Sequence, residues 1–357
     1  MASKVQNFGL VRKGAGHAVL EATPIPRLPD DYLLIKTVAV AINPTDWTTL
    51  DAVGDNGTLV GCDFAGIVEE IGPAVTKKFQ KGDRVAGFSH GGNDANPETG
   101  AFARFVIAKG DLVMHIPDNV SWEAAATVGV AIGTVGMGLY QIMGLKLPTE
   151  APQIGDGSDP VLVYGGSTAT GTIAIQFVRL SGRKVLTTCS PKHFELAKDR
   201  GAELVYDYHT PNIASDIRSE TNDQLIDVFD TVALESTAAF CSDAIGSSGG
   251  LYVNLLGVQS QRSDVRSVFY LGYSASGESF IFEGQHFPAK PEDLVFARNF
   301  FAVAEKLWME GKWKSHPVRV GSGGLIGVLD GMKQMKEGKV SGEKLVYLVD
   351  DTEWPAV

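Results

Sequence analysis

A short apolar run followed by a glycine-rich turn constrains this chain more than any other feature. Val161 to Tyr164 are apolar and β-favouring, as in a strand buried on both faces. Gly165, Gly166 and Gly171 then frame a polar turn, after which the apolar spacing becomes helical. A strand, tight turn and helix in this order direct helix N–H groups at a pyrophosphate, so we expect a dinucleotide site here. Its predicted turn contacts are Ser167, Thr168, Ala169 and Thr170. The strict G-x-G-x-x-G spacing is absent, so a purely structural turn is the alternative.

The next predicted strand, Lys184 to Thr188, indicates which dinucleotide binds. A cofactor without a 2′-phosphate favours an acidic residue after this strand, and none lies between Lys184 and Phe194. The chain offers polar and basic groups there, which suit a phosphate dianion. We therefore predict NADPH rather than NADH, bound by Ser190, Pro191, Lys192 and His193. The alternative is an ordinary helix start, with Ser190 as N-cap and Pro191 at the first helical position.

Composition excludes several classes of protein. The 357 residues are 44% hydrophobic and 20% charged with a net charge of −11, which is typical of a globular protein and argues against nucleic acid as a partner. The three cysteines are an odd number without metal-type spacing, which argues against a disulfide framework and favours a reducing compartment and a cytoplasmic location. The apolar stretch from Ala124 to Tyr140 holds four glycines and is shorter than the ~20 residues of a membrane span, so we expect buried helices and no membrane partner.

The order of predicted elements indicates two kinds of architecture. Short strands separated by Gly, Asp and Pro fill the first 122 residues, with predicted strands at 18–22, 32–42, 61–71, 84–88 and 100–108. Ser121 is a plausible N-cap for the helix that follows. From residue 161 strands alternate with helices, which predicts a parallel sheet with right-handed crossovers. A long helix from about Pro291 and strands near 318–320 and 345–349 complete the chain.

Several motifs resemble the medium-chain dehydrogenase/reductase superfamily over nearly the whole chain. They are Val40–Asp46, Gly61–Val68, Lys81–Val85 and Gly201–Tyr208. The resemblance implies an α/β fold in which a Rossmann doubly wound parallel sheet is inserted into a GroES-like β-rich catalytic domain. The implied bounds are 1–122 with 291–357 for the catalytic domain, and 123–290 for the NADPH-binding domain.

Within that superfamily the chain is most similar to the fungal stand-alone enoyl reductases that serve polyketide synthases in trans. The residues that carry this are Tyr164–Thr170, Thr188–Pro191 and Ser341–Val346. The resemblance implies NADPH-dependent reduction of an α,β-unsaturated acyl thioester on the carrier protein of a polyketide synthase or a polyketide–nonribosomal peptide hybrid. A free-standing quinone or enone reductase and a non-catalytic NADPH-binding partner are the alternatives. The glycines near the predicted edge strand, Val268 to Tyr273, favour a monomer.

Zinc is not expected. Zinc enzymes of this fold need a cysteine, a histidine and a further cysteine or carboxylate around the metal. Asn43–Asp46 stands where the first cysteine would be, and Gly61–Phe64 where a histidine would follow the glycine. Cys62 alone is interpreted as a buried apolar residue.

The resemblance also places the remaining site residues. It implies that Thr48 and Thr134 are catalytic, and that position 48, a lysine in several relatives, has lost its charge. The implied cofactor contacts are Thr45, Asp46, Trp47, Thr48, Tyr208, Leu255, Leu256, Val346 and Tyr347. The implied acyl pocket consists of Val130, Ala131, Ile132, Gly133, Thr134, Val135, Gly136, Met137, Ser276, Gly277, Glu278, Ser279 and Phe280. Core packing is the alternative for Leu255, Leu256 and the glycines, and a hydrogen bond within its own helix is the alternative for Thr134.

Overall fold

The computed structural model describes residues 6–52, 54, 57–150 and 159–355. Their contacts divide the chain into two compact units. The first unit consists of Met1–Val130, Tyr273–Glu305 and Ser315–Val357, and the second of Ala131–Gly272 and Lys306–Lys314. The second unit is therefore inserted into the sequence of the first.

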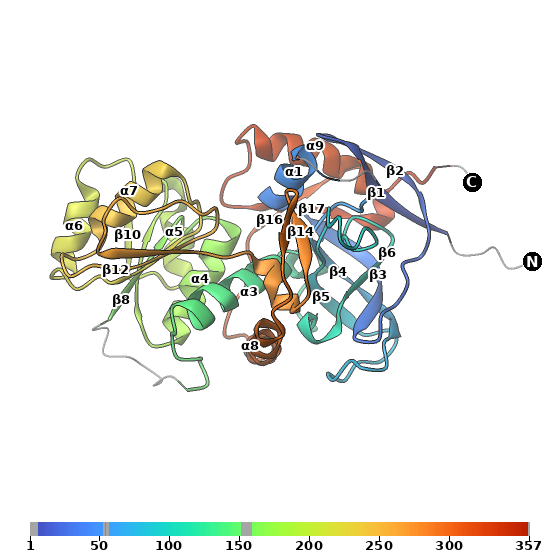
Figure 1. Ribbon diagram of the computed structural model, residues 1–357, viewed down its shortest axis with the longest axis horizontal. Helices are drawn as coiled ribbons and strands as arrows, with labels where there is room; N and C mark the ends of the chain where they lie inside the picture. The colour runs from blue at the N-terminus through green and yellow to red at the C-terminus, as the bar shows by residue number, and fades with distance from the viewer. Residues whose placement is uncertain (1–5, 53, 55–56, 151–158, 356–357) are drawn as a thin grey trace, which may run out of the picture. The chain divides into compact units, whose positions relative to one another are not determined.

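The second unit is built on a six-stranded parallel sheet (Figure 1). Its strands are β8 (Pro160–Tyr164), β9 (Lys184–Thr188), β10 (Leu204–Tyr206), β11 (Asp227–Asp230), β12 (Gly250–Asn254) and β13 (Val265–Phe269). The crossover helices are α4 (Ala169–Leu180), α5 (Phe194–Asp199), α6 (Ile213–Glu220) and α7 (Glu235–Ala244). The spatial order β10-β9-β8-β11-β12-β13 reverses direction at β8, and open α/β sheets bind ligands at such a point.

The first unit contains a mainly antiparallel sheet with the order β16-β17-β3-β4-β5-β7, in which β6 also pairs with β3. Its strands are β3 (Tyr32–Ala41), β4 (Asp63–Ile71), β5 (Arg84–Phe88), β6 (Phe105–Lys109), β7 (Met114–His115), β16 (Val318–Gly321) and β17 (Lys344–Leu348). Two hairpins add β1 (Asn7–Gly14) with β2 (His17–Thr23), and β14 (Phe280–Phe282) with β15 (Gln285–Phe287). Helix α1 (Pro44–Asp51) lies beside α9 (Gly324–Lys336).

A further helical stretch includes α2 (Trp122–Ala125), α3 (Gly129–Val135) and a π-helix at Gly136–Ile142. By length and composition alone, residues 122–142 are apolar enough to cross a membrane. However, 83% of their most apolar window is buried within the protein, as is usual for a core helix. Helix α8 spans Pro291–Met309.

The predicted α/β fold class is confirmed, and most predicted strands lie within one or two residues of the observed ones. Ser121 caps α2 as predicted, because its Oγ accepts a hydrogen bond from the Ala124 N–H at 3.2 Å. The prediction of a strand starting at Gly100 is wrong, since β6 begins at Phe105. Residues 101 and 102 instead donate their N–H groups to the Gly61 and Val60 carbonyls, in a loop that buries the Phe102 ring against Gly61.

Candidate active site

The turn after β8 has the geometry that its glycines predict. Gly165 adopts φ +84°, which favours glycine. A Cβ on Gly171 would overlap the Gly165 carbonyl, so the first turn of α4 packs directly on the loop. Thr168 caps the helix, with its Oγ1 accepting from the Gly171 N–H at 2.8 Å and lying 2.9 Å from Thr231 Oγ1. The half-buried Ser167, Ala169 and Thr170 complete a turn at which helix N–H groups are available to an anion.

The predicted 2′-phosphate contacts lie at the same end of the sheet, in the loop after β9. The Ser190 Oγ lies 3.1 Å from the Tyr208 Oη and makes no capping bond to the turn Pro191–His193. Lys198 pairs with Glu195 at 3.0 Å, and Arg200 pairs with Asp199. Lys192 is exposed and forms no ion pair with any residue that the structure describes. The structure thus brings Ser190 and Tyr208 together. Lys192, two residues after Ser190, is the nearby cation that forms no ion pair within the described residues.

Leu255 and Leu256 follow the carboxyl end of β12. Asn254 Oδ1 accepts hydrogen bonds from the N–H groups of Gly257 at 2.8 Å and Val258 at 3.1 Å, which folds the loop back on itself. As a result Leu256 is 65% exposed, so core packing does not account for it. Leu255 is half-buried.

The predicted acyl-pocket segment from Ala131 to Met137 is buried in the second unit. Thr134 is 7% exposed, and its carbonyl oxygen accepts a hydrogen bond from Tyr270 Oη at 2.6 Å. Gly272 lies against the Thr134 side chain, since a Cβ there would be 3.2 Å from Thr134 Oγ1. The preceding residue, Val130, belongs to the first unit and donates its N–H to Asp63 Oδ1 at 2.6 Å.

In the first unit, α1 carries four of the predicted cofactor contacts. Asp46 Oδ2 accepts the Asn43 N–H at 2.7 Å and thereby caps the helix. Burial raises the pKa of Asp46 to about 7, against the lowering effect of the Asn43 backbone and the Cys62 thiol. Its other oxygen makes no well-formed hydrogen bond within the described residues, although Cys62 lies near enough to interact. Thr48 donates its hydroxyl to the Thr45 carbonyl at 3.3 Å, and Trp47 packs half-buried on the core.

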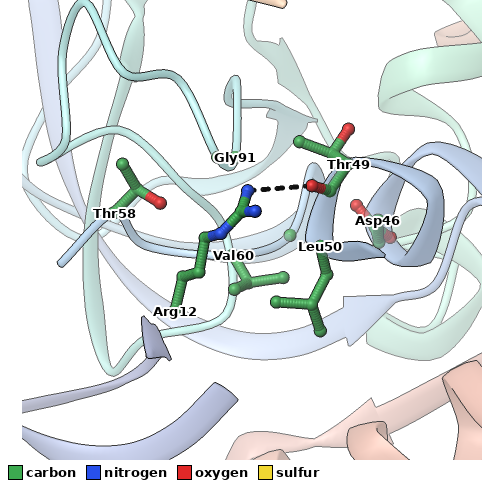
Figure 2. Close-up of a pocket in the computed structure, with 9 residues that line it drawn as sticks. Arg12, Asp46, Thr49, Leu50, Thr58, Val60 and Gly91 are labelled. Carbon is green, nitrogen blue, oxygen red and sulfur yellow. Dashed lines mark hydrogen bonds between the residues drawn. The ribbon is translucent and has the colours of Figure 1, made fainter. Parts of the chain in front are cut away.

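A buried arginine holds the other end of α1 (Figure 2). Arg12, on β1, is 2% exposed and donates from Nη1 to the Thr49 carbonyl at 3.0 Å and from Nη2 to the Ala52 carbonyl. These are carbonyls of the last turn of α1, where a cation is favourable. Arg12 and Asp46 line the same small cavity, which Figure 2 shows. The Arg12 hydrogen bonds hold the end of α1 against β1.

Asn43 and Asp63, from the segments Asn43–Asp46 and Gly61–Phe64, meet Lys344 in a buried polar cluster. Lys344 donates to Asn43 Oδ1 at 2.7 Å and forms an ion pair with Asp63, and Asn43 Nδ2 donates to Asp63 Oδ2 at 3.0 Å. Within the described residues, no three His, Cys, Asp or Glu side chains are grouped to hold a metal ion. Val346 and Tyr347, on the same strand as Lys344, are buried opposite β3, and Tyr347 belongs to the core of the unit.

One residue of this region was missed by the sequence interpretation. Tyr273 lies in a turn after β13, yet its Oη is 2.9 Å from Thr45 Oγ1 and 3.3 Å from Cys62 Sγ. Its ring stacks on His90, with ring centroids 3.6 Å apart. No local sequence pattern indicates this contact, because 228 residues separate Tyr273 from Thr45.

A cavity of the first unit is lined both by Tyr273 and by residues of the predicted acyl-pocket segment Ser276–Phe280. Its walls include His90, Tyr273, Ser276, Glu278, Ser279 and Phe280. Glu278 accepts from Tyr32 Oη at 2.6 Å and pairs with Lys109, so its charge is balanced. Gly277 adopts φ +72°, which lets the chain turn between these residues. Burial lowers the pKa of His90 to about 3, so its ring is neutral.

Comparisons with known proteins identify the family of this chain. The model of the alcohol dehydrogenase GroES-like domain matches residues 29–118. The trans-enoyl reductase resD of Aspergillus sclerotiorum is 43% identical over 345 residues, which cover 93% of this chain and 97% of that protein. The trans-enoyl reductase ACTTS2 of Alternaria alternata is 43% identical over 96% of this chain and 98% of its own length. This chain belongs to the fungal trans-enoyl reductase family.

Another family member, the trans-enoyl reductase TOXD of Cochliobolus carbonum, is 49% identical over 77% of this chain and 92% of its own length. Solved structures share the fold at lower identity. The CurK enoyl reductase matches with a TM-score of 0.75 at 18% identity, covering 96% of this chain and 99% of that one. The quinone oxidoreductase from Coxiella burnetii matches with a TM-score of 0.71 at 22% identity, over 97% and 100% of the two chains. The family predicted from the motifs is therefore confirmed.

Proposed function

We propose that this family member is an NADPH-dependent enoyl reductase that acts in trans. Its substrate would be an α,β-unsaturated polyketide acyl thioester on the carrier protein of a polyketide synthase or a polyketide–nonribosomal peptide hybrid, in fungal secondary metabolism. The observation that carries the proposal is the similarity to trans-enoyl reductases along nearly the whole chain, at 43% identity.

The second unit fits a nicotinamide dinucleotide. The glycine turn leaves no room for a side chain at Gly171, and the capped start of α4 offers N–H groups for the pyrophosphate. We assign the 2′-phosphate to Ser190, Lys192 and Tyr208, because two hydroxyls and an unpaired cation suit a dianion and no carboxylate competes in the loop. The neighbouring Pro191 and His193 complete that loop.

Bound NADPH would supply a hydride to the β-carbon of the acyl group, and the chain must stabilise the resulting charge. As the hydride arrives, negative charge develops on the thioester oxygen. The α-carbon then takes a proton, from a side chain or from water. We assign the α1 segment Thr45–Thr48 to the nicotinamide end of the site, and the residues around Ser276–Phe280 to the acyl group.

The test compares acceptors and cofactors on the purified protein. We expect oxidation of NADPH with an enoyl-pantetheine thioester, little oxidation of NADH, and little turnover of a panel of small quinones. Preferred turnover of quinones would support a free-standing quinone reductase. Binding of NADPH without oxidation by any acceptor would indicate a non-catalytic partner, and either result would overturn the proposal.

A charge test addresses the cofactor by itself. The variant Lys192→Glu should weaken NADPH binding at least tenfold and leave NADH binding nearly unchanged. Lys146→Glu, which alters a second lysine of the same unit outside the proposed site, is the matched control. Equal losses for both cofactors would refute the assigned role of Lys192.

We further propose that the protein is a monomer. Strand β13 forms one edge of the parallel sheet, and the chain leaves it within a few residues in a 3₁₀ turn at Gly272–Ser276. That leaves a short edge for pairing with a second copy. Sedimentation at micromolar concentration should give a mass near 38.0 kDa, and a mass twice as large would contradict the proposal.

A further inference from the structure

The proposed reaction requires a hydrogen-bond donor at the thioester oxygen. Thr48 is uncharged and uses its hydroxyl on the Thr45 carbonyl. Lys109 lines the same cavity as His90 and Tyr273 but is held by Asp31 at 2.7 Å and by Glu278. Thr48 is not among the residues that line this cavity, whereas Tyr273 lines it and also reaches α1 through Thr45.

Tyr273 has the geometry for this role. Its hydroxyl lies 2.9 Å from Thr45 Oγ1, on the helix assigned to the nicotinamide end, while its ring forms part of the wall that also contains Ser276 and Phe280. The ring is held by stacking on His90, and by an edge contact with Phe280 at a centroid distance of 5.9 Å. One side chain thus connects the two groups of residues that the reaction needs together.

The surroundings of Tyr273 keep its hydroxyl protonated. Burial, followed by the nearby Cys62 thiol and the Asp46 carboxyl, raises the pKa of the phenol well above its usual value. Burial likewise raises the pKa of Cys62. The neutral His90 ring faces the phenol and adds no charge. A phenol in these surroundings donates a hydrogen bond without losing its proton.

We propose that Tyr273 is a catalytic residue whose hydroxyl donates the hydrogen bond to the thioester oxygen of the substrate. As the hydride of NADPH bonds to the β-carbon, the π electrons of the C=C bond shift to make an enolate, and the oxygen takes up the negative charge. The O–H of Tyr273 stays intact and holds that charge until the α-carbon takes a proton derived from water. This inference rests on the proposed function, since it assumes an enoyl thioester in the cavity.

The decisive experiment uses a chromophoric thioester, cinnamoyl-pantetheine, and the full chain with Tyr273→Phe. A hydrogen bond to the carbonyl polarises the conjugated system and shifts its absorption to the red, so the shift reports the bond without any turnover. We expect the shift in the wild type, with NADP⁺ present, and its loss in Tyr273→Phe. We also expect kcat with NADPH to fall by about 10²-fold while KM for the thioester changes less than threefold.

The matched control is Tyr140→Phe, which removes another buried hydroxyl, one that donates to the Phe177 carbonyl at 3.0 Å in the second unit. It should keep both the shift and kcat. Should Tyr273→Phe fail to fold, replacement of Tyr273 by 3-fluorotyrosine keeps the ring and provides a stronger donor. The red shift should then increase, and an unchanged shift would refute the proposal.

The outcomes separate the two proposals. A Tyr273→Phe protein that retains the shift and the wild-type kcat overturns the role of Tyr273 and leaves enoyl reduction standing. A loss of the shift in a His90→Phe protein that keeps its NADPH affinity, with the shift retained in Tyr273→Phe, would assign the donor to His90 instead. A wild type that neither oxidises NADPH nor shifts the absorption overturns the proposed function, and with it the role of Tyr273.

Discussion

Lys344 and Asp63 form an ion pair in the interior of the first unit, where the lysine side chain is 3% exposed and the aspartate is fully buried. Asn43 bridges the pair, accepting from Lys344 at 2.7 Å and donating to Asp63 at 3.0 Å. Asp63 also accepts the Val130 N–H. The pair therefore joins β17, β4 and the start of α1.

Removal of one partner of this pair should be costly. Lys344→Met leaves the Asp63 carboxylate buried without its cation, which typically costs about 3–5 kcal/mol of unfolding free energy. The double variant Lys344→Met/Asp63→Asn should recover much of that loss, and urea unfolding measures both. Lys81→Met, which removes a 73% exposed lysine paired with Glu69, should cost no more than about 1 kcal/mol. Equal effects of the two lysine variants would contradict this account.

The pKa of Asp46, near 7, predicts how stability depends on pH. The folded chain holds this proton at pH values where the unfolded aspartate, with a pKa of about 3.9, has lost it. Between about pH 4 and 7 the folded state thus binds more protons, so this group lowers the unfolding free energy as pH rises.

The variant Asp46→Asn should remove that dependence. Its unfolding free energy should change less between pH 4 and 7 than that of the wild type, and it should exceed the wild type at pH 8. The exposed Asp118→Asn is the control and should leave the profile unchanged. Parallel profiles for Asp46→Asn and the wild type would show that the carboxyl titrates normally.

Arg12 links β1 to the end of α1, the helix that carries four of the predicted cofactor contacts. Arg12→Met removes the donors that satisfy the Thr49 and Ala52 carbonyls. Each carbonyl left buried without a partner should lower the unfolding free energy by about 1–3 kcal/mol. The end of α1 should loosen, so we expect a lower Tm and a several-fold higher Kd for NADPH. Hydrogen exchange of the α1 amides locates the change. The exposed Arg27→Met is the control, and no faster exchange in Arg12→Met would refute the link.

The turn after β8 predicts a strict requirement at Gly171. In Gly171→Ala the new Cβ overlaps the Gly165 carbonyl, so the turn must open at a cost of about 1–3 kcal/mol. NADPH affinity should fall by tenfold or more, as measured by cofactor fluorescence. Gly14→Ala, which has open space around it, should bind NADPH normally. Normal binding by Gly171→Ala would mean that this turn does not hold the pyrophosphate.

The elements that could be predicted from the sequence depend on neighbouring residues. The buried strand at Val161–Tyr164 and its glycine turn were visible because their signals are short and contiguous. The same holds for Ser121 as a cap. The roles of Thr45, Thr48, Leu256 and the acyl-pocket residues came from the family resemblance, and their contacts with ligands remain predictions.

The features that could not be predicted depend on distant residues. The Arg12 contact with α1 spans 37 residues, and the Lys344–Asp63 pair spans 281. Tyr273 carries no local pattern that distinguishes a site residue from the end of an edge strand. Its assignment needs the fold that returns residues 273–305 to the first unit.

The late position of β17 in the chain has a consequence for biogenesis. This strand pairs with Ala39–Ala41 of β3, so that part of the β3 edge stays unpaired until the chain has been synthesised as far as Lys344. The strands of the inserted parallel sheet are complete by residue 269, and they are free to fold on the ribosome while the host sheet still lacks β16 and β17. A nascent chain arrested before Lys344 would expose both that edge and an Asp63 carboxylate without its lysine partner. Chaperones that bind incompletely folded chains would act on this state.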